Sequence, residues 1–366
     1  MNFDLSEDEE MLKALAERFV ADNYDIERRR SFLAEPHGFS AANWALLGEL
    51  GLIAAAFDEQ AGGMALDATG IATIFEALGR GLVVEPLIEN VLLAGRLFAA
   101  TARGVLRDGW LPGLLTGERR IAFAHAETKA RGGHLWIETR ADAAGRIDGG
   151  KAYVPAGAGC DGYVVSARTA GSPDTADGLG LYFVPAGAAG LSIDEWRMAD
   201  GSTAASLDFA QVAAERLDGG VSDVAGIEPI ADLARSAEAL GIMERIFAET
   251  TDYLRTRRQF GSALADFQAI QHRMVAQYAA IEQSRGLLNQ ALVNHGGEGF
   301  EHAVRGLRAF IAPASIELGH EMIQFHGGMG VTDELAIGHG HKRLLVLSRW
   351  PDDPETALDR FAGIAA

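Results

Sequence analysis

Two long helical patterns on either side of a short basic connection, residues 253–261, constrain this fold more than any other feature. Upstream, apolar residues recur at three- and four-residue steps from Leu233 to Tyr253, and downstream they do so from Phe267 to Leu292. That spacing places an apolar stripe along each segment, so we expect two amphipathic helices that pack against a common core. The connection between them is Tyr-Leu-Arg-Thr-Arg-Arg-Gln-Phe-Gly.

The connection is basic in a chain that is otherwise acidic. Lysine and arginine number 32 against 51 aspartates and glutamates, which gives a net charge of −19. Such a field repels polyphosphates, so we expect no nucleic-acid partner and no anionic membrane surface. Arg255, Arg257 and Arg258 are a local exception, because guanidinium groups offer paired donors to phosphate oxygens. From spacing alone, a phosphate-holding turn and a solvated turn with ordinary surface arginines are equally consistent.

The sequence changes character twice along its 366 residues. Ser6 with Glu9 forms a capping-box pattern, and Ser40 precedes a second helical pattern that Gly51 ends. The middle of the chain has short β-rich runs between Gly, Asp and Pro clusters, typical of a small barrel or sandwich. We therefore predict an α+β multidomain protein: an N-terminal helical domain over 1–118, a middle all-β domain over 119–220, and a C-terminal four-helix-bundle domain over 221–366. Strands are predicted at 121–125, 134–139, 163–167, 179–184 and 205–209, and helices at 66–79 and 87–100.

Several site types are not supported by the sequence. His339 and His341 are the closest histidines, but residues two apart do not share a helix face, so we predict no metal site. Gly157–Gly162 matches the dinucleotide-binding glycine pattern, but a strand pattern follows it where a helix is needed, so we predict a β-turn. Cys160 is the only cysteine and is predicted to be structural, which excludes an internal disulfide and suits a cytoplasmic protein. No apolar run approaches the ~20 residues that span a bilayer.

Two motifs resemble the acyl-CoA dehydrogenase family. The first is the connection itself, in the pattern Tyr-x-x-x-Arg-x-x-Phe-Gly followed by Phe-Gln, and the second is Gln-Phe-His-Gly-Gly-Met-Gly at 324–330. The resemblance covers nearly the whole chain. It implies the fold of that family, an FAD cofactor at a dimer interface, and oxidation of an acyl-CoA thioester to 2-enoyl-CoA. It also implies an electron-transferring flavoprotein as electron acceptor.

The resemblance assigns the cofactor-binding residues, which serve the flavin of the neighbouring protomer. Arg257 corresponds to the pyrophosphate ligand and Phe260 packs near the adenosine. The nucleotide portion is assigned to Gln268, Gln324, Gly327 and Gly328. These residue types suit the role, because glycine permits close backbone approach and arginine neutralises phosphate.

The part of the family site that contacts the flavin ring differs in this chain. The family's Thr-Glu-Pro-x-x-Gly-Ser-Asp stretch corresponds here to Ala126–Gly133, and its Trp-Ile-Thr stretch to Tyr153–Pro155. Ala126 and Pro155 therefore stand where side-chain hydroxyls are usual, and neither residue has a side-chain donor. His125 and the main chain remain to compensate.

The catalytic base is also missing from its usual place. The family removes an α-proton with a glutamate in a Tyr-Glu-Gly stretch, and the corresponding position here is Pro351. Some members carry the base on the helix before the arginine motif, at a position that falls near Ala231. The catalytic residue is thus unknown from sequence. Asp232 and Glu238 are the candidates, with Glu228 nearby, and packing or surface roles are the more expected ones.

These departures resemble the small subunits of pimeloyl-CoA dehydrogenase and related two-subunit enzymes that act on dicarboxylic or steroid side-chain acyl-CoA esters. We therefore expect a hetero-oligomer whose partner supplies the base. Two alternatives stay open. One is a homo-oligomeric dehydrogenase, dimer or tetramer, with a relocated carboxylate. The other is a structural or regulatory paralogue without turnover.

Overall fold

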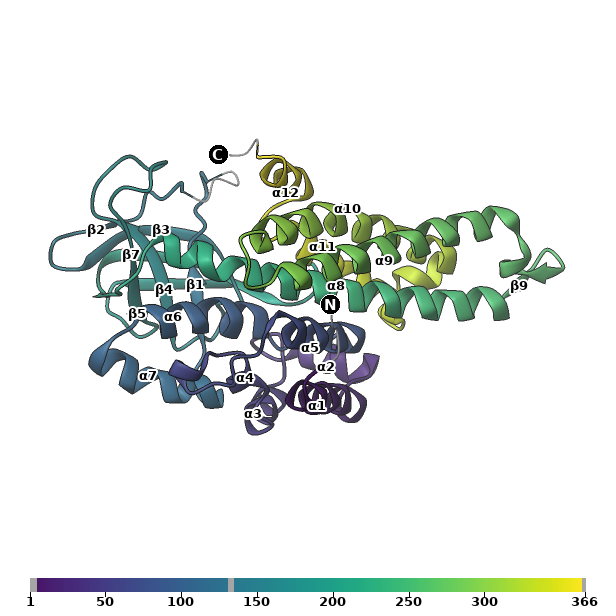
Figure 1. Ribbon diagram of the computed structural model, residues 1–366, viewed down its shortest axis with the longest axis horizontal. Helices are drawn as coiled ribbons and strands as arrows, with labels where there is room; N and C mark the ends of the chain where they lie inside the picture. The colour runs from purple at the N-terminus through teal and green to yellow at the C-terminus, as the bar shows by residue number, and fades with distance from the viewer. Residues whose placement is uncertain (1–4, 131–134, 364–366) are drawn as a thin grey trace. The chain divides into compact units, whose positions relative to one another are not determined.

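The computed structural model describes residues 5–130 and 135–363 (Figure 1). The chain forms two compact units, each drawn from separate stretches of sequence. The first unit takes the described residues of Met1–Ser31, Asp67–Val83 and Asp232–Ala366, and the second takes Phe32–Leu66 and Val84–Ala231. The three consecutive domains expected from the sequence, with boundaries at 118 and 220, stay a prediction.

The first unit is helical. Ser6 begins α1 with the predicted capping box, since its hydroxyl accepts from the Glu9 amide at 3.3 Å and its amide donates to the Glu9 carboxylate at 2.8 Å. Asp67 caps α5 by accepting from the Thr69 and Gly70 amides. The helices that lie wholly or partly in this unit are α1 (Glu7–Asn23), α2 (Ile26–Ala34), α5 (Ala68–Gly81), α8 (Val221–Thr256), α9 (Gln268–Asn294), α10 (Phe300–His326), α11 (Ala336–Arg349) and α12 (Pro354–Phe361).

Helices α8 and α9 are the two segments that the apolar spacing predicts. On α8 the predicted stripe is buried, with Leu233, Leu240 and Ile246 at 0% exposure. On α9 the interior side buries Met274, but Tyr278 is 52% exposed. The predicted helical period of the apolar residues is therefore correct. Helix α9 carries apolar side chains on two faces, and the rest of this chain covers only one of these faces.

Short elements join these helices. Strands β9 (Arg258–Gln259) and β10 (Ser262–Ala263) form a hairpin beyond the ends of α8 and α9, followed by a 3₁₀ turn η3 (Leu264–Asp266) (Figure 1). A second 3₁₀ segment, η4 (Gly327–Val331), follows α10. Helix α10 packs against α9, α11 and α12.

The second unit holds the sheet, whose strand order is β6-β7-β3-β2-β4-β5-β8, with β1 paired in parallel to β4. Its inward side chains enclose one apolar core that includes Val154, Tyr163, Tyr182 and Leu207. The strands are β1 (Ile121–Ala124), β2 (Arg140–Ala141), β3 (Arg146–Pro155), β4 (Gly162–Arg168), β5 (Leu179–Pro185), β6 (Leu191–Arg197), β7 (Thr203–Ala213) and β8 (Glu215–Arg216).

Four of the five predicted strands are confirmed, in β1, β4, β5 and β7. The prediction over 134–139 is wrong for residues 135–139, which precede β2 as irregular chain, and residue 134 lies outside the described residues. Strand β3 was missed because Gly149 and Gly150 interrupt its alternation.

Residues 157–161 lie in the turn between β3 and β4, and Gly162 begins β4, so the predicted β-turn is confirmed. Gly159 has a φ of 60°, which favours glycine. Cys160 lies in this turn, 5% exposed, with its thiol donating to the Ala156 carbonyl at 3.2 Å. Burial raises the pKa of the thiol to about 11, so it stays protonated at neutral pH.

Helices α3 (Ala41–Glu49), α4 (Leu52–Ala55), α6 (Arg96–Thr101) and α7 (Gly104–Thr116) complete the second unit, with a 3₁₀ turn η1 (Glu59–Ala61) and a π-helical segment η2 (Ile88–Gly95). Ser40 caps α3 as predicted, accepting from the Asn43 amide at 3.3 Å. In η2, the Asn90 amide donates to the Ile121 carbonyl at 2.9 Å and so ties this helix to β1. Over the described residues, no helix has the length and apolar content needed to cross a membrane.

Candidate functional site

The hairpin tip presents a strained aromatic residue. Gln259 pairs with Ser262 across the hairpin, and the two residues between them, Phe260 and Gly261, have φ values of 52° and 87°. Two positive φ angles are typical of the type I′ turn, which suits a β-hairpin but costs free energy at a non-glycine residue. Phe260 is nevertheless 91% exposed. An exposed ring at a strained position does little for this chain's own core, which favours a binding role.

Arg257 is anchored through its backbone. Its amide donates to the Tyr253 carbonyl at 2.8 Å, and its carbonyl accepts from the Leu264 amide at 2.9 Å. Its side chain is exposed, as is that of Arg258. In the described parts of the chain, no carboxylate forms an ion pair with either guanidinium. Both are therefore available to an anion from outside this chain.

The end of α10 offers open backbone. Gln324, Gly327 and Gly328 are all exposed. Gly327 has φ 59° and ψ −137°, a region that side-chain-bearing residues avoid. A methyl group added at Gly327 or Gly328 would meet no atom within 4 Å. These glycines thus leave the main chain accessible to a ligand.

Two side-chain contacts bring these segments together at one end of the bundle. The rings of Tyr253 on α8 and His326 on α10 stack, with 4.3 Å between centroids. Arg273 on α9 binds Glu321 on α10 through two hydrogen bonds of 2.6 and 2.7 Å, and its guanidinium lies 4.6 Å from the Phe325 ring centroid. The residues assigned to FAD from sequence, on the hairpin, the start of α9 and the end of α10, are therefore held at one end of one unit.

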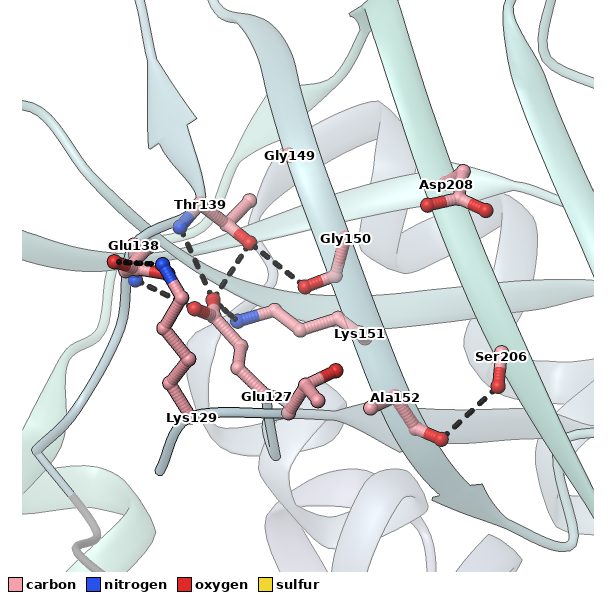
Figure 2. A pocket seen from close by; sticks show the side chains of 11 residues that line it. Glu127, Lys129, Glu138, Thr139, Gly149, Gly150, Lys151, Ala152, Ser206 and Asp208 are labelled. Carbon is pink, nitrogen blue, oxygen red and sulfur yellow. Dashed lines mark hydrogen bonds and ion pairs between the residues drawn. The ribbon is translucent and has the colours of Figure 1, made fainter. Parts of the chain in front are cut away.

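The second unit has a pocket of about 470 Å³ between the sheet and the segments around residues 127 and 138 (Figure 2). A buried ion pair lies in its wall, where the Lys151 ammonium is 2.7 Å from the Glu127 carboxylate. The three ammonium protons of Lys151 go to Glu127, the His125 carbonyl and the Ser166 hydroxyl. The other lining residues are Thr128, Lys129, Glu138, Thr139, Gly149, Gly150, Ala152, Ser206 and Asp208.

Burial governs the charges of this pair. It lowers the pKa of Lys151 to about 8, although Glu127 opposes the shift. For Glu127, burial would raise the pKa, but Lys151 and the Thr139 hydroxyl, which donates at 2.6 Å, bring it below its ordinary value. Lys129 and Glu138 form a second, exposed pair at 3.1 Å in the same wall (Figure 2).

The positions that correspond to the family's ring contacts are adjacent in the sheet. Ala126 forms a bridge with Tyr153, and its carbonyl accepts from the Ala152 amide at 3.0 Å. The Tyr153 hydroxyl donates to the Met198 sulfur at 2.7 Å. Ala126 and Pro155 supply no side-chain donor, and the hydroxyl of Tyr153 is already used. This face therefore offers few donors to a flavin ring.

The two candidate bases are both paired with arginine. Both oxygens of Glu238 accept from Arg343, at 2.6 and 3.0 Å, and Glu238 is only 6% exposed. Asp232 accepts from Arg235 at 2.8 Å. Glu228 is half-buried on the first part of α8. Nothing here assigns a catalytic role to any of the three, so their roles stay predictions.

The carboxylate next to Pro351 is also paired. Asp352 is 8% exposed and lies 2.6 Å from the Arg360 guanidinium. Burial lowers the pKa of Arg360 to about 10, which still leaves it charged at neutral pH. In the described residues, no group of three or more His, Cys, Asp or Glu side chains could hold a metal ion.

The end of the first unit that carries the β9–β10 hairpin, the start of α9 and the end of α10, called here the bundle end, has residue types that fit FAD. The exposed guanidinium groups can bind a pyrophosphate, and the open glycine backbone lets it approach the main chain. The exposed aromatic ring can pack against the face of an adenine. The donor-poor face around Ala126 and Pro155 does not add hydrogen bonds for the ring. The chemistry on this chain thus favours binding the nucleotide half of FAD.

Sequence reasoning missed the Arg273–Glu321 pair and the Lys151–Glu127 pair. Each joins residues far apart in the sequence, 48 positions in the first case and 24 in the second. A single sequence carries no signal for such partners beyond the residue types themselves.

Known proteins resemble this chain over nearly its whole length. A family model described as acyl-CoA dehydrogenase, N-terminal domain, matches residues 6–118, and one described as acyl-CoA dehydrogenase, C-terminal domain, matches residues 233–350. Acyl-CoA dehydrogenase FadE27 of Mycobacterium tuberculosis is 26% identical over 351 residues, covering 90% of each chain.

Solved structures share the fold. The structure described as the Tcur3481-Tcur3483 steroid ACAD G363A variant has a TM-score of 0.87 at 27% identity, covering 98% of this chain and 97% of that chain. The ChsE4-ChsE5 complex from Mycobacterium tuberculosis has a TM-score of 0.89 at 24% identity, covering 99% of this chain and 98% of that chain.

Proposed function

Because this chain belongs to the acyl-CoA dehydrogenase family, we propose that it is the smaller subunit of a two-subunit, FAD-dependent acyl-CoA dehydrogenase. Members of the family are oxidoreductases that act on CH–CH donors, with FAD as cofactor. The proposal concerns the division of labour: this chain binds the nucleotide half of FAD, and a companion chain supplies the catalytic base.

The observation that carries this proposal is the state of the acidic side chains. A base for α-proton removal needs a carboxylate with an accessible oxygen in a water-poor pocket. Glu238 has both oxygens bound to Arg343, and Asp232 is bound to Arg235. Position 351, where the family places its glutamate, is proline, and the neighbouring Asp352 is paired with Arg360. Arginine thus binds both oxygens of Glu238 and one oxygen each of Asp232 and Asp352, and by stabilising the charged carboxylate it lowers the tendency of each acid to take a substrate proton.

The exposed bundle end supports the other half of the proposal. All six residues assigned to FAD are exposed on this chain: Arg257, Phe260, Gln268, Gln324, Gly327 and Gly328. A cofactor bound there would be covered by a second chain and not by this one. The apolar side chains left exposed on α9, such as Val275 at 65% and Tyr278 at 52%, are consistent with an oligomer.

Each residue then has a physical task. Arg257 neutralises the pyrophosphate, Gly327 and Gly328 let the main chain approach it, and Phe260 packs against the adenosine. The cofactor held by these residues would supply a hydride acceptor for the acyl thioester. The substrate we propose is a dicarboxylic or steroid side-chain acyl-CoA ester. The structural neighbour described as a steroid ACAD supports the steroid side-chain ester. We place the reaction in the cytoplasm, with an electron-transferring flavoprotein as acceptor.

The test is the flavin content of the chain purified alone and together with its companion. After incubation with FAD and removal of the unbound cofactor, we expect the chain alone to be colourless, and the complex to be yellow and to bleach on adding acyl-CoA. A chain that binds FAD alone and bleaches with acyl-CoA would overturn the proposal in favour of a homo-oligomeric enzyme.

Two further measurements separate the alternatives. In a self-sufficient enzyme with Asp232 as base, Asp232→Asn would keep flavin and lose turnover, whereas Asp252→Asn, an exposed carboxylate on the same helix, would change neither. In a non-catalytic paralogue, the complex would turn over no faster than the companion alone.

A further inference from the structure

We propose that Arg273 is a positioning residue for FAD, which fixes the cofactor-directed ends of α9 and α10 relative to each other through Glu321. The inference rests on the proposed function above. It adds a residue that has no cofactor contact assigned to it by the sequence motifs, and it assigns a purpose to an ion pair on the surface of the bundle.

The contact has a well-defined geometry. Nε and Nη2 of Arg273 each donate to a different oxygen of Glu321, at 2.6 and 2.7 Å. The same guanidinium lies over the Phe325 ring, 4.6 Å from its centroid. A planar guanidinium that makes two parallel hydrogen bonds and packs on an aromatic ring has little orientational freedom. A lysine ammonium that makes one such hydrogen bond has more.

The anchor points lie directly beside the residues assigned to FAD. Glu321 precedes Gln324 by three positions, which puts both on one face of α10. Phe325 follows Gln324 in the chain, and it is 8% exposed, so its ring is fixed in the bundle. On the other side, Arg273 lies in the second turn of α9, which begins at Gln268. The pair thus joins the two helix ends that carry Gln268 and Gln324.

Stability alone is a weak explanation for this pair. The Arg273 side chain is 46% exposed and the Glu321 side chain is 16% exposed, so solvent screens part of the attraction, and even with two hydrogen bonds the pair should contribute on the order of 1 kcal/mol. The Arg305–Glu301 pair provides a comparison within α10, because it is also exposed but links residues of a single helix. Of these two pairs, the Arg273 pair constrains one helix against another and the Arg305 pair does not.

The experiment uses the holoenzyme, isolated through a tag on this chain so that any companion subunit stays attached. The variants are Arg273→Met, Glu321→Gln, the exchanged pair Arg273→Glu with Glu321→Arg, and the control Arg305→Met. After dilution into FAD-free buffer, the rise in flavin fluorescence reports FAD release. Melting temperature without added FAD reports folding.

We expect both single variants to release FAD about tenfold faster, by analogy with metal sites, where removing a residue that orients a ligand costs about 10–100-fold in affinity. Their melting temperatures without FAD should stay close to that of the unchanged protein. The exchanged pair should recover part of the retention, and Arg305→Met should release FAD at the original rate.

Three results would count against the inference. Release at the original rate from Arg273→Met and Glu321→Gln overturns it. If both single variants have a lowered melting temperature and the exchanged pair does not recover FAD retention, the contact only stabilises the fold and does not position FAD. Equal acceleration in Arg305→Met shows a general surface-charge effect. If the unchanged holoenzyme itself holds no FAD, the proposed function fails first, and the two failures are thereby distinguished.

Discussion

Arg29 and His339 meet in a buried side-chain contact, with 2.7 Å between Nη1 of the arginine and Nδ1 of the histidine. Guanidinium can only donate, so Nδ1 of His339 accepts and the ring is neutral. Its proton is then on Nε2, which donates to the Asp333 carbonyl at 3.1 Å. Arg29 also donates from Nε to the Leu82 carbonyl at 3.0 Å, which links α2 and α11 to the end of α5.

This contact predicts a loss of stability in acid. Burial, with Arg29 as a further cause, lowers the pKa of His339 below 6.5, and burial beside His320 lowers the pKa of His341 to about 4. Since the unfolded chain binds these protons first, the free energy of unfolding should fall as pH drops from 6.5 towards 4. Urea unfolding at several pH values measures the slope.

A His339→Gln variant makes the acid prediction specific. The glutamine carbonyl can still accept from Arg29 but does not titrate, so its loss of stability between pH 6.5 and 4 should be smaller. Identical slopes in the two proteins would contradict the assignment to His339.

Gly241 should tolerate no side chain. A methyl group there would lie 2.2 Å from the Glu76 carbonyl oxygen on α5, and one at Gly79 would lie 2.3 Å from the Glu238 carbonyl oxygen on α8. The helices touch through backbone, so Gly241→Ala should lower the free energy of unfolding by about 1–3 kcal/mol. Gly226→Ala on the same helix meets nothing within 4 Å and should stabilise by about 0.5–1 kcal/mol. Equal effects of the two would refute the backbone contact.

The two ion pairs in the wall of the pocket should differ sharply in their contribution to stability. Glu127→Gln leaves the buried Lys151 ammonium without its counterion and should cost about 3–5 kcal/mol. Lys129→Met breaks the exposed pair with Glu138 and should cost under about 1 kcal/mol.

A double replacement separates pairing from burial. Lys151→Met with Glu127→Leu removes both buried charges. The double variant should therefore lose less free energy of unfolding than the sum of the losses in the two single variants. Denaturant unfolding of the four proteins is the measurement. A double variant that loses the full sum would mean that the two residues act independently.

Replacing Phe260 should raise the stability of the chain and weaken its binding of FAD. Glycine adopts a φ of 52° without strain, so Phe260→Gly should raise the free energy of unfolding of the chain by about 1 kcal/mol. The same change removes the ring proposed to pack on the adenosine, so the holoenzyme should lose FAD faster. Gln259→Ala, an exposed neighbour on β9, is the control. Unchanged FAD retention in Phe260→Gly would remove Phe260 from the site.

The helix caps and the apolar period of α8 are local signals, and the structure confirms them. The caps at Ser6 and Ser40 follow from hydroxyl groups that satisfy exposed amides, and such contacts span only a few residues. The stripe on α8 follows from its period. By contrast, the exposure of Tyr278 and the bulged strand β3 depend on which surfaces are covered in three dimensions. The π-helical turns of 88–95 carry the same apolar pattern as an ordinary helix.

In the candidate site, too, local motifs point to some residues, while other features depend on contacts between residues far apart in the sequence. Contiguous motifs assign Arg257, Phe260 and Gly327 to the cofactor because their chemistry is visible in the residue types, and this assignment stays a prediction. That Glu238 would meet Arg343 could not be seen, since the partners are 105 positions apart. Whether an acid is an open base or part of an ion pair is decided by such distant contacts.

The sealed thiol of Cys160 has a practical consequence for studying this enzyme. It is the only cysteine, and because it is buried and protonated it should react slowly with maleimides and other thiol reagents. A cysteine introduced on the surface could then carry a fluorophore or spin label at a single site, without first replacing the native residue. Distances from such a label to the proposed companion chain would test whether and how the two chains assemble.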